Sequence, residues 1–367
     1  SGNDTFNIGS GVSLSGTIDG RSGANTLTLA GINTTRNVSL TALGSLAGFN
    51  GTDASVPNGF FNISTLVGGT GNDSLNGLNI ASAWDIDGTN TYAARGRTLN
   101  FSAFENLIGG SDDDTFTLSA SQTNNLIGNS GADSVIFNDN ATLTGMFDGG
   151  ADDDTLDFSR YTTARIVTLN ALGSTAGFSG TATGISATFD NVETILGSSA
   201  ATDTWNGLNA DARWDVDGTN TYTAINAITF DNTNHTTRRT VATTTTALTT
   251  GDLSGLQVMN FVGFETLQGG STNDVFVITD SQTENLKGGG DEDYVIFNDG
   301  ATLTGSFNGE AGRDALDYVN YNTARAVVLT SVGTDGFNGT ESSLTNGFSN
   351  VNEIIGNNAI DSLTGLS

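Results

Sequence analysis

The 367-residue chain has no cysteine, one proline (Pro57), one histidine (His235) and one lysine (Lys287). Without cysteine it can form neither disulfides nor thiolate metal sites. A single histidine excludes repeated histidine-based acid–base or zinc sites. No apolar run approaches the ~20 residues of a membrane helix, and no charged-then-apolar leader opens the sequence. We therefore expect any export signal to have been removed or to lie outside this segment.

Basic residues are also scarce, with twelve Lys and Arg against forty Asp and Glu and a formal charge of −28. Such a charge repels phosphate backbones and anionic lipid, so we expect neither nucleic-acid binding nor membrane insertion in this segment. It fits a hydrated or cation-binding extracellular surface. Forty-nine glycines, twenty phenylalanines and many Val, Ile and Thr favour strands and tight turns over disorder.

Long internal repeats dominate the sequence. The segment Val135–Gly145 recurs almost unchanged at Val295–Gly305, and Trp84–Tyr92 recurs at Trp214–Tyr222. The two spacings differ because the second copy carries about thirty extra residues. We predict one continuous solenoid, a slice of a longer array, with module 1 at 1–129, module 2 at 130–289 with an inserted segment at about 223–263, and partial module 3 at 290–367.

A shorter motif lies inside each long repeat: an apolar residue, any residue, glycine, four residues, then aspartate followed by alternating apolar residues. Its aspartates recur 19 and 21 residues apart in two sets of three, while the gaps from Asn25 to Asp73 and from Asp73 to Asp114 are near two such units. Alternation at period two places the apolar residues on one face of a short strand. A unit of about 20 residues cannot bury that face without similar neighbours.

The pattern predicts an all-β fold, a parallel β-solenoid (β-helix) of roughly 20-residue rungs forming an elongated rod. An antiparallel sandwich array would also have short strands and glycine-rich turns, but it would not show the 20-residue sub-period.

The segment Gly68-Gly-Thr-Gly-Asn-Asp73-Ser-Leu75 resembles the calcium-binding nonapeptide of RTX proteins, and the other turns resemble relaxed versions of it. As a whole the chain resembles giant repetitive bacterial surface β-solenoid proteins and adhesins. In RTX domains calcium lies between stacked turns, bound by carboxylate and backbone oxygens. The resemblance implies calcium as the one cofactor, with candidate ligands Asp73, Asp114, Asp133, Asp154, Asp274, Asp293, Asp314 and Asp361.

The turns depart from that family because one matching turn occurs per 19 to 24 residues, not two per 18-residue coil. The alternative is structural: each Asp or Asn bonds nearby backbone amides and stacks into a ladder. Asn25 favours the ladder, since it keeps the hydrogen bonds without the charge. The Asp triplets 112–114 and 152–154 favour calcium, because stacked like charges repel. Both interpretations stay open.

A second candidate metal site involves Asp85 and Asp87 and their copies Asp215 and Asp217, which resemble the start of an EF-hand loop. The glutamate expected at position twelve is replaced by Gly96 or Asn226. The adjoining Trp84 and Trp214 suit either glycan stacking or packing, and a fixed repeat position favours packing. Three arginines, Arg36, Arg165 and Arg325, recur in register, and we interpret them as structural partners of the Asp ladder or a neighbouring rung.

The sequence has no nucleophile elbow and no phosphate-binding loop. A polysaccharide-active β-helix enzyme, our third alternative, would need one unrepeated acid cluster, but here acids occur in every repeat. We therefore predict no catalytic residues and no enzyme activity. We expect a secreted, extracellular or bacterial cell-surface structural protein: a fibre, sheath or adhesin stalk whose partners are neighbouring copies or flanking repeats end to end. The alternative is an adhesin module that binds a glycan or protein receptor, with the insertion as its binding feature.

Overall fold

The computed structural model describes residues 2–225, 228, 242–243, 246–247 and 256–366. They divide into two compact units: unit 1 is Ser1–Thr162 with Gly173–Thr194, and unit 2 is Thr163–Leu172 with Ile195–Ser367. The described residues contain strands but no helix, and most strands pair in parallel with strands one rung away, which confirms the all-β solenoid. Among them, accordingly, no helix has the length and apolar character needed to span a membrane.

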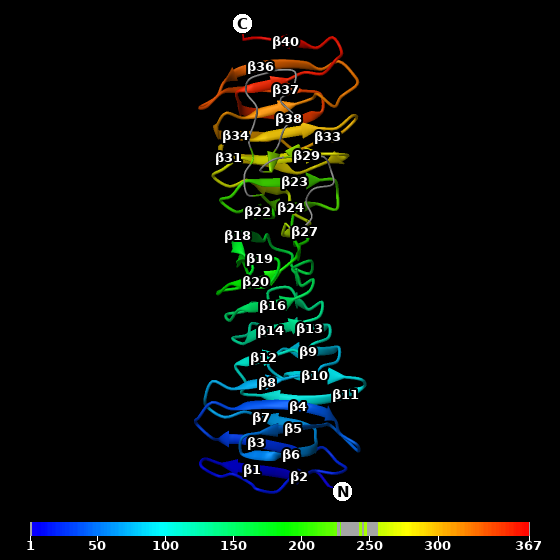
Figure 1. Cartoon of the computed structure of the whole chain (residues 1–367), viewed down its shortest axis with the longest axis vertical. Helices are drawn as coiled ribbons and strands as arrows, with labels where there is room; N and C mark the ends of the chain where they lie inside the picture. The colour runs from blue at the N-terminus through cyan, green and yellow to red at the C-terminus, as the bar shows by residue number, and fades with distance from the viewer. Residues whose placement is uncertain (1, 226–227, 229–241, 244–245, 248–255, 367) are drawn as a thin grey trace. The chain divides into compact units, whose positions relative to one another are not determined.

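In unit 1 the chain passes back and forth between two sheets, whose strands lie one above another (Figure 1). Sheet A contains β1 (Thr5–Gly9), β3 (Thr26–Gly31), β7 (Thr65–Val67), β9 (Ser82–Ile86), β10 (Thr91–Ala94), β11 (Arg97–Ser102), β13 (Asp114–Leu118), β15 (Ser134–Phe137) and β17 (Thr155–Asp157). Sheet B contains β2 (Ile18–Asp19), β4 (Asn37–Leu43), β5 (Phe49–Asp53), β6 (Val56–Ile63), β8 (Ser74–Asn76), β12 (Asn106–Ile108), β14 (Asn125–Ser130), β16 (Phe147–Ala151), β19 (Phe178–Ala182) and β20 (Phe189–Val192).

Unit 2 has the same two-sheet plan. Its sheet A contains β21 (Thr194–Leu196, which begins at the last residue of unit 1), β23 (Ala212–Val216), β24 (Thr221–Ala224), β27 (Val258–Val262), β29 (Asp274–Ile278), β32 (Tyr294–Phe297), β35 (Ala315–Asp317) and β39 (Glu353–Ile355). Its sheet B contains β18 (Ile166–Leu172), β22 (Thr204–Asn206), β28 (Thr266–Gln268), β30 (Ser281–Gln282), β31 (Asn285–Asp291), β33 (Thr302–Leu303), β34 (Phe307–Gly312), β36 (Ala326–Val332), β37 (Phe337–Glu341), β38 (Leu344–Val351) and β40 (Ser362–Thr364). A separate pair is formed by β25 (Ala242–Thr243) and β26 (Thr246–Ala247).

The apolar residues that alternate after each aspartate form columns inside the solenoid. Phe116 lies beside Val135, and Val135 lies beside Leu156, one rung further along. All three side chains are fully buried. The period-two pattern therefore predicted the buried face of these strands correctly, because stacked rungs in parallel register bring equivalent side chains together.

The two longer gaps between motif positions do not hold two rungs each, as their length suggested. Each holds an antiparallel three-strand excursion within one sheet. Between Asn25 and Asp73, β4, β5 and β6 form a meander, with β6 parallel to β2 and β4 parallel to β8. Between Asp73 and Asp114, β9, β10 and β11 do the same in sheet A, between β13 and β7. The chain thus runs backwards through each excursion before it continues.

Unit 2 repeats this arrangement with β23, β24 and β27 in sheet A and β36, β37 and β38 in sheet B. The predicted insertion at about 223–263 begins inside β24 and ends just after β27, and both are core strands whose Tyr222 and Phe261 are fully buried. Most residues between these strands lie outside the described part of the chain.

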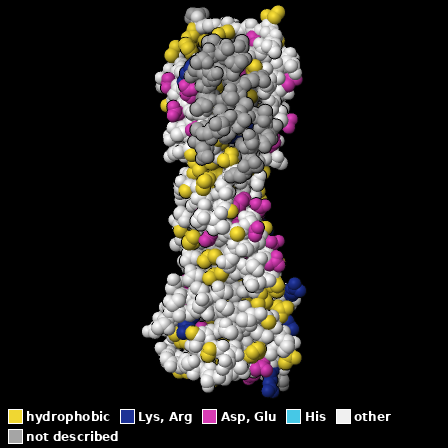
Figure 2. All heavy atoms as spheres, in the orientation of Figure 1, with side chains coloured by type: hydrophobic (Ala, Val, Ile, Leu, Met, Phe, Trp, Pro, Cys, Tyr) yellow, Lys and Arg dark blue, Asp and Glu magenta, His cyan; other side chains and the backbone are white. Residues whose placement is uncertain are grey.

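The described residues on one face of the molecule are mostly uncharged at the surface. Figure 2 shows a face made mostly of uncharged polar side chains and backbone, with acidic and hydrophobic side chains scattered over it. Many of the acidic residues singled out in the sequence are absent from this surface because they are buried.

Candidate functional site

The motif aspartates stand at the end of a glycine turn, immediately before or at the first residue of a strand. Their side chains are almost completely buried, with exposures of 0–1% for Asp73, Asp114, Asp133, Asp154, Asp274, Asp293 and Asp314, while Asp361 is partly exposed. Burying a carboxyl group is costly unless it is hydrogen-bonded or neutral. The partners of each oxygen therefore define the chemistry of the site.

One oxygen of each aspartate links two rungs. In unit 1 the main-chain N–H of Asp114 donates to Asp133 Oδ1 (2.7 Å), and that of Asp133 donates to Asp154 Oδ1 (2.8 Å). In unit 2 the N–H groups of Asp274 and Asp293 donate in the same way to Asp293 and Asp314. The ladders continue to Glu193 in unit 1 and Asn352 in unit 2. We call these two stacks the aspartate ladders.

Shorter stacks of the same kind occur at the opposite turn, where the chain enters sheet B. Asp73 Oδ1 accepts the N–H of Arg36, and the N–H of Asp73 donates to Glu105 Oε2, both at 2.7 Å. In unit 2, Asp203 takes the place of Asp73, with Arg165 below it and Glu265 above it. Asp361 accepts the N–H of Arg325.

Sequence reasoning missed Asp203 because its turn, Gly197 to Asp203, is one residue longer than the motif. The signal that identifies it is the segment that follows: Trp205-Asn-Gly-Leu-Asn209 matches Leu75-Asn-Gly-Leu-Asn79 after Asp73. The glutamates Glu105, Glu193 and Glu265 were also missed. They lie just before a strand without the glycine turn, and the longer side chain reaches the same N–H from a different position.

The second oxygen divides the aspartates into two groups. In Asp73, Asp114, Asp203, Asp274 and Asp361, Oδ2 accepts a main-chain N–H from its own turn. In Asp133, Asp154, Asp293 and Asp314, Oδ2 is buried and has no hydrogen-bond partner. The four strands before this second group, β14, β16, β31 and β34, continue past the motif glycine. Their residues beyond the glycine pair with each other across neighbouring rungs, β14 with β16 and β31 with β34.

Burial raises the pKa of the ladder carboxyls well above the usual value of 3.8. The pKa rises to about 7 for Asp133 and Asp314, about 8 for Asp154 and about 10 for Asp293. Desolvation is the main cause in each case, and neighbouring carboxyls add to it. Burial also raises the pKa of Asp274 to about 8 and that of Glu193 to about 7.

Calcium takes six to eight oxygen ligands, which gives a direct test of the predicted metal turns. The part of the chain that the structure describes contains no group of three or more acidic or histidine side chains arranged to hold a metal ion. Oxygens of the candidate ligands instead accept main-chain N–H groups, as the ladder interpretation expects. As arranged, the turns do not provide the ligand set that calcium requires, so calcium binding there stays a prediction for experiment.

The segment that resembles an EF-hand start is the hairpin turn between β9 and β10. Asp87 Oδ1 accepts the N–H of Thr89 (2.7 Å), and Asn90 Oδ1 accepts the N–H of Gly88 (2.9 Å). The hydrogen bonds from Thr89 lower the pKa of Asp87. Asp217 and Asn220 repeat the turn in unit 2, and Asp215 forms an ion pair with Arg213. An Asp-Gly pair of this kind is a strong hairpin signal.

The repeated tryptophans are packing residues, as their fixed position predicted. Trp84 and Trp214 are 1% and 0% exposed. Trp84 packs edge-on against Tyr92 at 4.6 Å between ring centroids and stacks on Phe116 at 5.5 Å. Trp214 makes the same contacts in unit 2. Neither ring presents a face to a glycan.

The repeated arginines are structural, as predicted. All three donate a main-chain N–H to an aspartate side chain, which is buried in Asp73 and Asp203 and partly exposed in Asp361. The guanidinium of Arg36 pairs with buried Asp53, and that of Arg325 pairs with buried Glu341.

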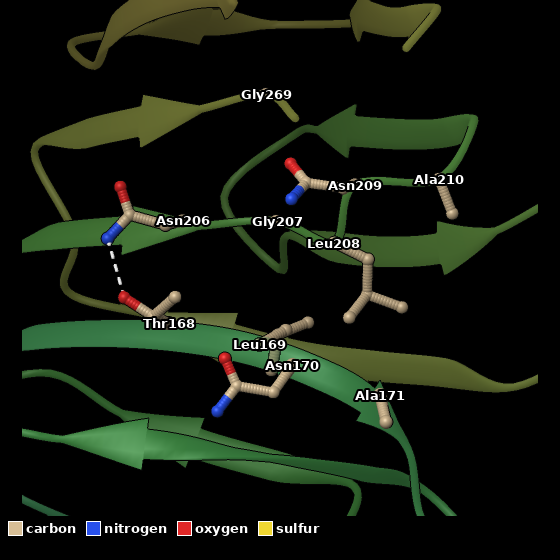
Figure 3. Close-up of a pocket in the computed structure, with 10 residues that line it drawn as sticks. All are labelled: Thr168, Leu169, Asn170, Ala171, Asn206, Gly207, Leu208, Asn209, Ala210 and Gly269. Carbon is tan, nitrogen blue, oxygen red and sulfur yellow. Dashed lines mark hydrogen bonds between the residues drawn. The ribbon is translucent and has the colours of Figure 1, made fainter. Parts of the chain in front are cut away.

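A groove recurs at one place in both units. In unit 2 it has a volume of about 360 Å³, and its lining includes Leu169, Asn170, Leu208 and Asn209 (Figure 3). One wall is tied together by Asn206 Nδ2, which donates to Thr168 Oγ1 (2.9 Å). The unit 1 groove has a volume of about 670 Å³ and is lined by the corresponding residues Leu40, Thr41, Leu78 and Asn79, together with Arg95. Because Asn79 and Asn209 are exposed, their amide groups are accessible to a ligand.

The sequence matches no protein-family model and no curated protein. The class of protein is therefore defined by the fold and the ladders themselves: a β-solenoid whose rungs are joined by buried acidic side chains.

Proposed function

We propose that this chain is a structural extracellular surface or filament protein, in which a rigid acidic β-solenoid rod serves as a fibre, sheath or adhesin stalk. It would be secreted or held at the cell surface, with further repeats or neighbouring copies as end-to-end partners. One observation carries the proposal: the most regular acidic residues are buried and hydrogen-bonded from rung to rung. Acids placed in this way stabilise stacking in every repeat.

An enzyme function has less support. Glycoside-cleaving sites need two carboxyl groups that face the substrate across a cleft. The repeated carboxyls here are buried, and one of their oxygens is engaged by the backbone of the neighbouring rung. The exposed acids that remain are scattered over the visible face.

Rigidity and calcium dependence can be tested together. Because the chain has no cysteine, Ser10→Cys and Ser174→Cys, both exposed and both in unit 1, would carry the only spin labels. We expect a narrow distribution of label distances and a melting temperature that survive chelator treatment. A broad distribution, with or without calcium, would refute a rigid structural role. Recovery by calcium but not magnesium after chelation would keep the rod but make the turns metal sites.

A second candidate function is the adhesin module, and the repeated groove favours it. The exposed amide groups of Asn79 and Asn209 suit a neutral sugar, which offers hydroxyls along its edge. The test is binding of the chain to an array of glycans, with Asn79→Ala and Asn209→Ala combined. Asn346→Ala, an exposed residue outside the groove, is the matched control. Binding that is lost only in the groove variant would support the adhesin, and no binding to any glycan would remove this candidate.

A further inference from the structure

The unpartnered Oδ2 atoms of Asp133, Asp154, Asp293 and Asp314 share one environment. A methyl group added to Gly149 would lie 2.4 Å from Asp154 Oδ2 and 2.2 Å from the carbonyl oxygen of Asn191 in the next rung. In unit 2, Asp314 Oδ2 and the Asn350 carbonyl oxygen crowd Gly309 at 2.3 Å each. Each carboxyl oxygen therefore has a carbonyl oxygen as its neighbour, not an N–H group.

Asp133 and Asp293 repeat this geometry one rung earlier. Their Oδ2 atoms crowd Gly128 and Gly288, together with the carbonyl oxygens of Gly149 and Gly309. Two oxygens that both only accept hydrogen bonds repel each other, and the repulsion is strong in a buried site. A proton on the carboxyl group converts one of them into a donor.

The first repeat shows which partner this position requires. Asn25 occupies the place of Asp154 and Asp314, because its side chain crowds Gly20 in the same way. Its Oδ1 accepts the N–H of Asp4 (3.0 Å), and its Nδ2 donates to the carbonyl oxygen of Asn62 (3.2 Å). Asn62, Asn191 and Asn350 are equivalent, with left-handed φ values of 56°, 54° and 54°. The position therefore needs an acceptor toward the rung below and a donor toward the rung above.

We propose that Asp133, Asp154, Asp293 and Asp314 are proton-binding sites, held as neutral carboxylic acids whose Oδ2–H donates to the carbonyl oxygen of the next rung. Oδ1 keeps its main-chain N–H, so each acid links three rungs as Asn25 does. The bound ligand is a proton, which neutralises a stack of like charges without a metal ion. This inference does not depend on the biological role of the solenoid.

The surrounding charges favour the protonated form. The charges with the largest effect on the four groups are acidic and belong to the ladders and the adjoining turns: Asp113, Asp114, Asp148, Asp152 and Glu193 in unit 1, and Asp274, Asp291, Glu292, Glu310 and Asp335 in unit 2. The basic Arg313, next to Asp314 in the sequence, pairs with Glu353 (3.2 Å). Burial acts in the same direction. Since the pKa is raised in the folded state, the stabilisation is complete below pH 4 and is lost as the pH rises through the folded-state pKa values.

The decisive experiment replaces Asp154 and Asp314 with asparagine in the full chain and measures unfolding against pH. Asparagine provides the donor at every pH. We expect Asp154→Asn and Asp314→Asn to melt close to wild type at pH 5 and above wild type at pH 9. The melting temperature of each variant should therefore change less between pH 5 and pH 9 than that of wild type. Asp73→Asn is the matched control, because both Asp73 oxygens accept N–H groups and an amide would place a donor against a donor. It should melt lower at both pH values.

Two outcomes would overturn the proposal. If Asp154→Asn and Asp314→Asn lower the melting temperature at pH 9 as Asp73→Asn does, the carboxyls are charged. If calcium raises the melting temperature of chelator-treated wild type but not of Asp154→Asn, a cation occupies the site. Infrared spectroscopy provides a readout independent of stability: wild type at pH 6 should show the band of protonated carboxyl groups, weakened in each variant, and its absence in wild type would also refute the proposal.

Discussion

The ion pair between Arg36 and Asp53 provides a quantitative test of how the three-strand excursions are held. Arg36 precedes β4, and Asp53 ends β5 within the same excursion. The guanidinium donates from Nε to Asp53 Oδ2 (3.1 Å), from Nη2 to Asp53 Oδ1, and to Ser55 Oγ (2.9 Å). The side chains of Arg36 and Asp53 are only 11% and 0% exposed. Solvent therefore screens the pair little, and removing one partner leaves a buried charge.

The magnitude follows from these contacts. Asp53→Ala removes the acceptor of the Ser55 N–H (2.8 Å) and also the two charge-assisted hydrogen bonds from the Arg36 guanidinium, each worth about 1.5–3 kcal/mol. Their sum agrees with the about 3–5 kcal/mol lost when one partner of a buried pair is removed. Replacing both residues, with Arg36→Met and Asp53→Leu, removes the charges together and should recover most of that loss, because a buried pair contributes little more than apolar residues of similar volume.

Urea unfolding of the three proteins, followed by circular dichroism, measures both effects. The single variant should lower the free energy of unfolding by about 3–5 kcal/mol, and the double variant should lie within about 1.5 kcal/mol of wild type. A loss below about 1 kcal/mol in Asp53→Ala would mean that the pair contributes no more than a solvent-exposed ion pair. If the double variant is no more stable than the single one, the loss of stability comes from the lost contacts and not from an unpaired buried charge.

Three further predictions concern the core and the ladders. Gly207→Ala should lower the free energy of unfolding by about 1–3 kcal/mol, because the added Cβ would lie 2.7 Å from the Trp214 ring and 3.0 Å from the Tyr222 ring. Gly16→Ala, at a position with open space around it, should change the melting temperature little. Equal effects of the two substitutions would contradict the packing argument. Tyr222→Phe should cost about 1–3 kcal/mol, since the hydroxyl accepts the Leu208 N–H (3.0 Å); wild-type protection of that amide from hydrogen exchange would argue against it. The wild-type urea midpoint should fall as the pH rises from about 4 to about 8, because the folded state holds protons on Asp133, Asp154 and Asp314, whose pKa values are about 7, 8 and 7; a midpoint that rises over this range would reverse the assigned sign.

The rungs were predictable because their signal is periodic. Glycine, aspartate and alternating apolar residues recur at a spacing close to one coil, and a face of that size can be buried only by stacking. The apolar residues after Asp114, Asp133 and Asp154 accordingly lie in one column of the core. Asn25 at a motif position indicated a hydrogen-bonded ladder before any geometry was known.

The excursions were not predicted, because their strands alternate at the same period as those of the rungs. The signal that distinguishes an excursion from a rung lies in the turns between its strands. Asp87-Gly88 and Arg95-Gly96 both form hairpin turns, with φ of 97° at Gly88 and of 45° and 77° at Arg95 and Gly96. An acidic residue before glycine suits a hairpin turn as well as a metal loop, so composition alone could not choose between them. The sequence also did not indicate which ladder aspartates have an Oδ2 without a hydrogen-bond donor, because this depends on where the strand before each aspartate ends.

The backward course of each excursion has a mechanical consequence. In a simple solenoid the end coil can be pulled off without disturbing the next. In unit 1, tension on the N-terminal side would peel away β1 to β3 and then reach β4, which is paired with β5 on one side and β8 on the other. β4 cannot leave as an edge strand, and the strands beside it must yield with it. Each excursion should therefore resist unfolding one strand at a time. Under force the chain should lengthen in steps of several strands at once, and each released residue should add about 3.3–3.6 Å.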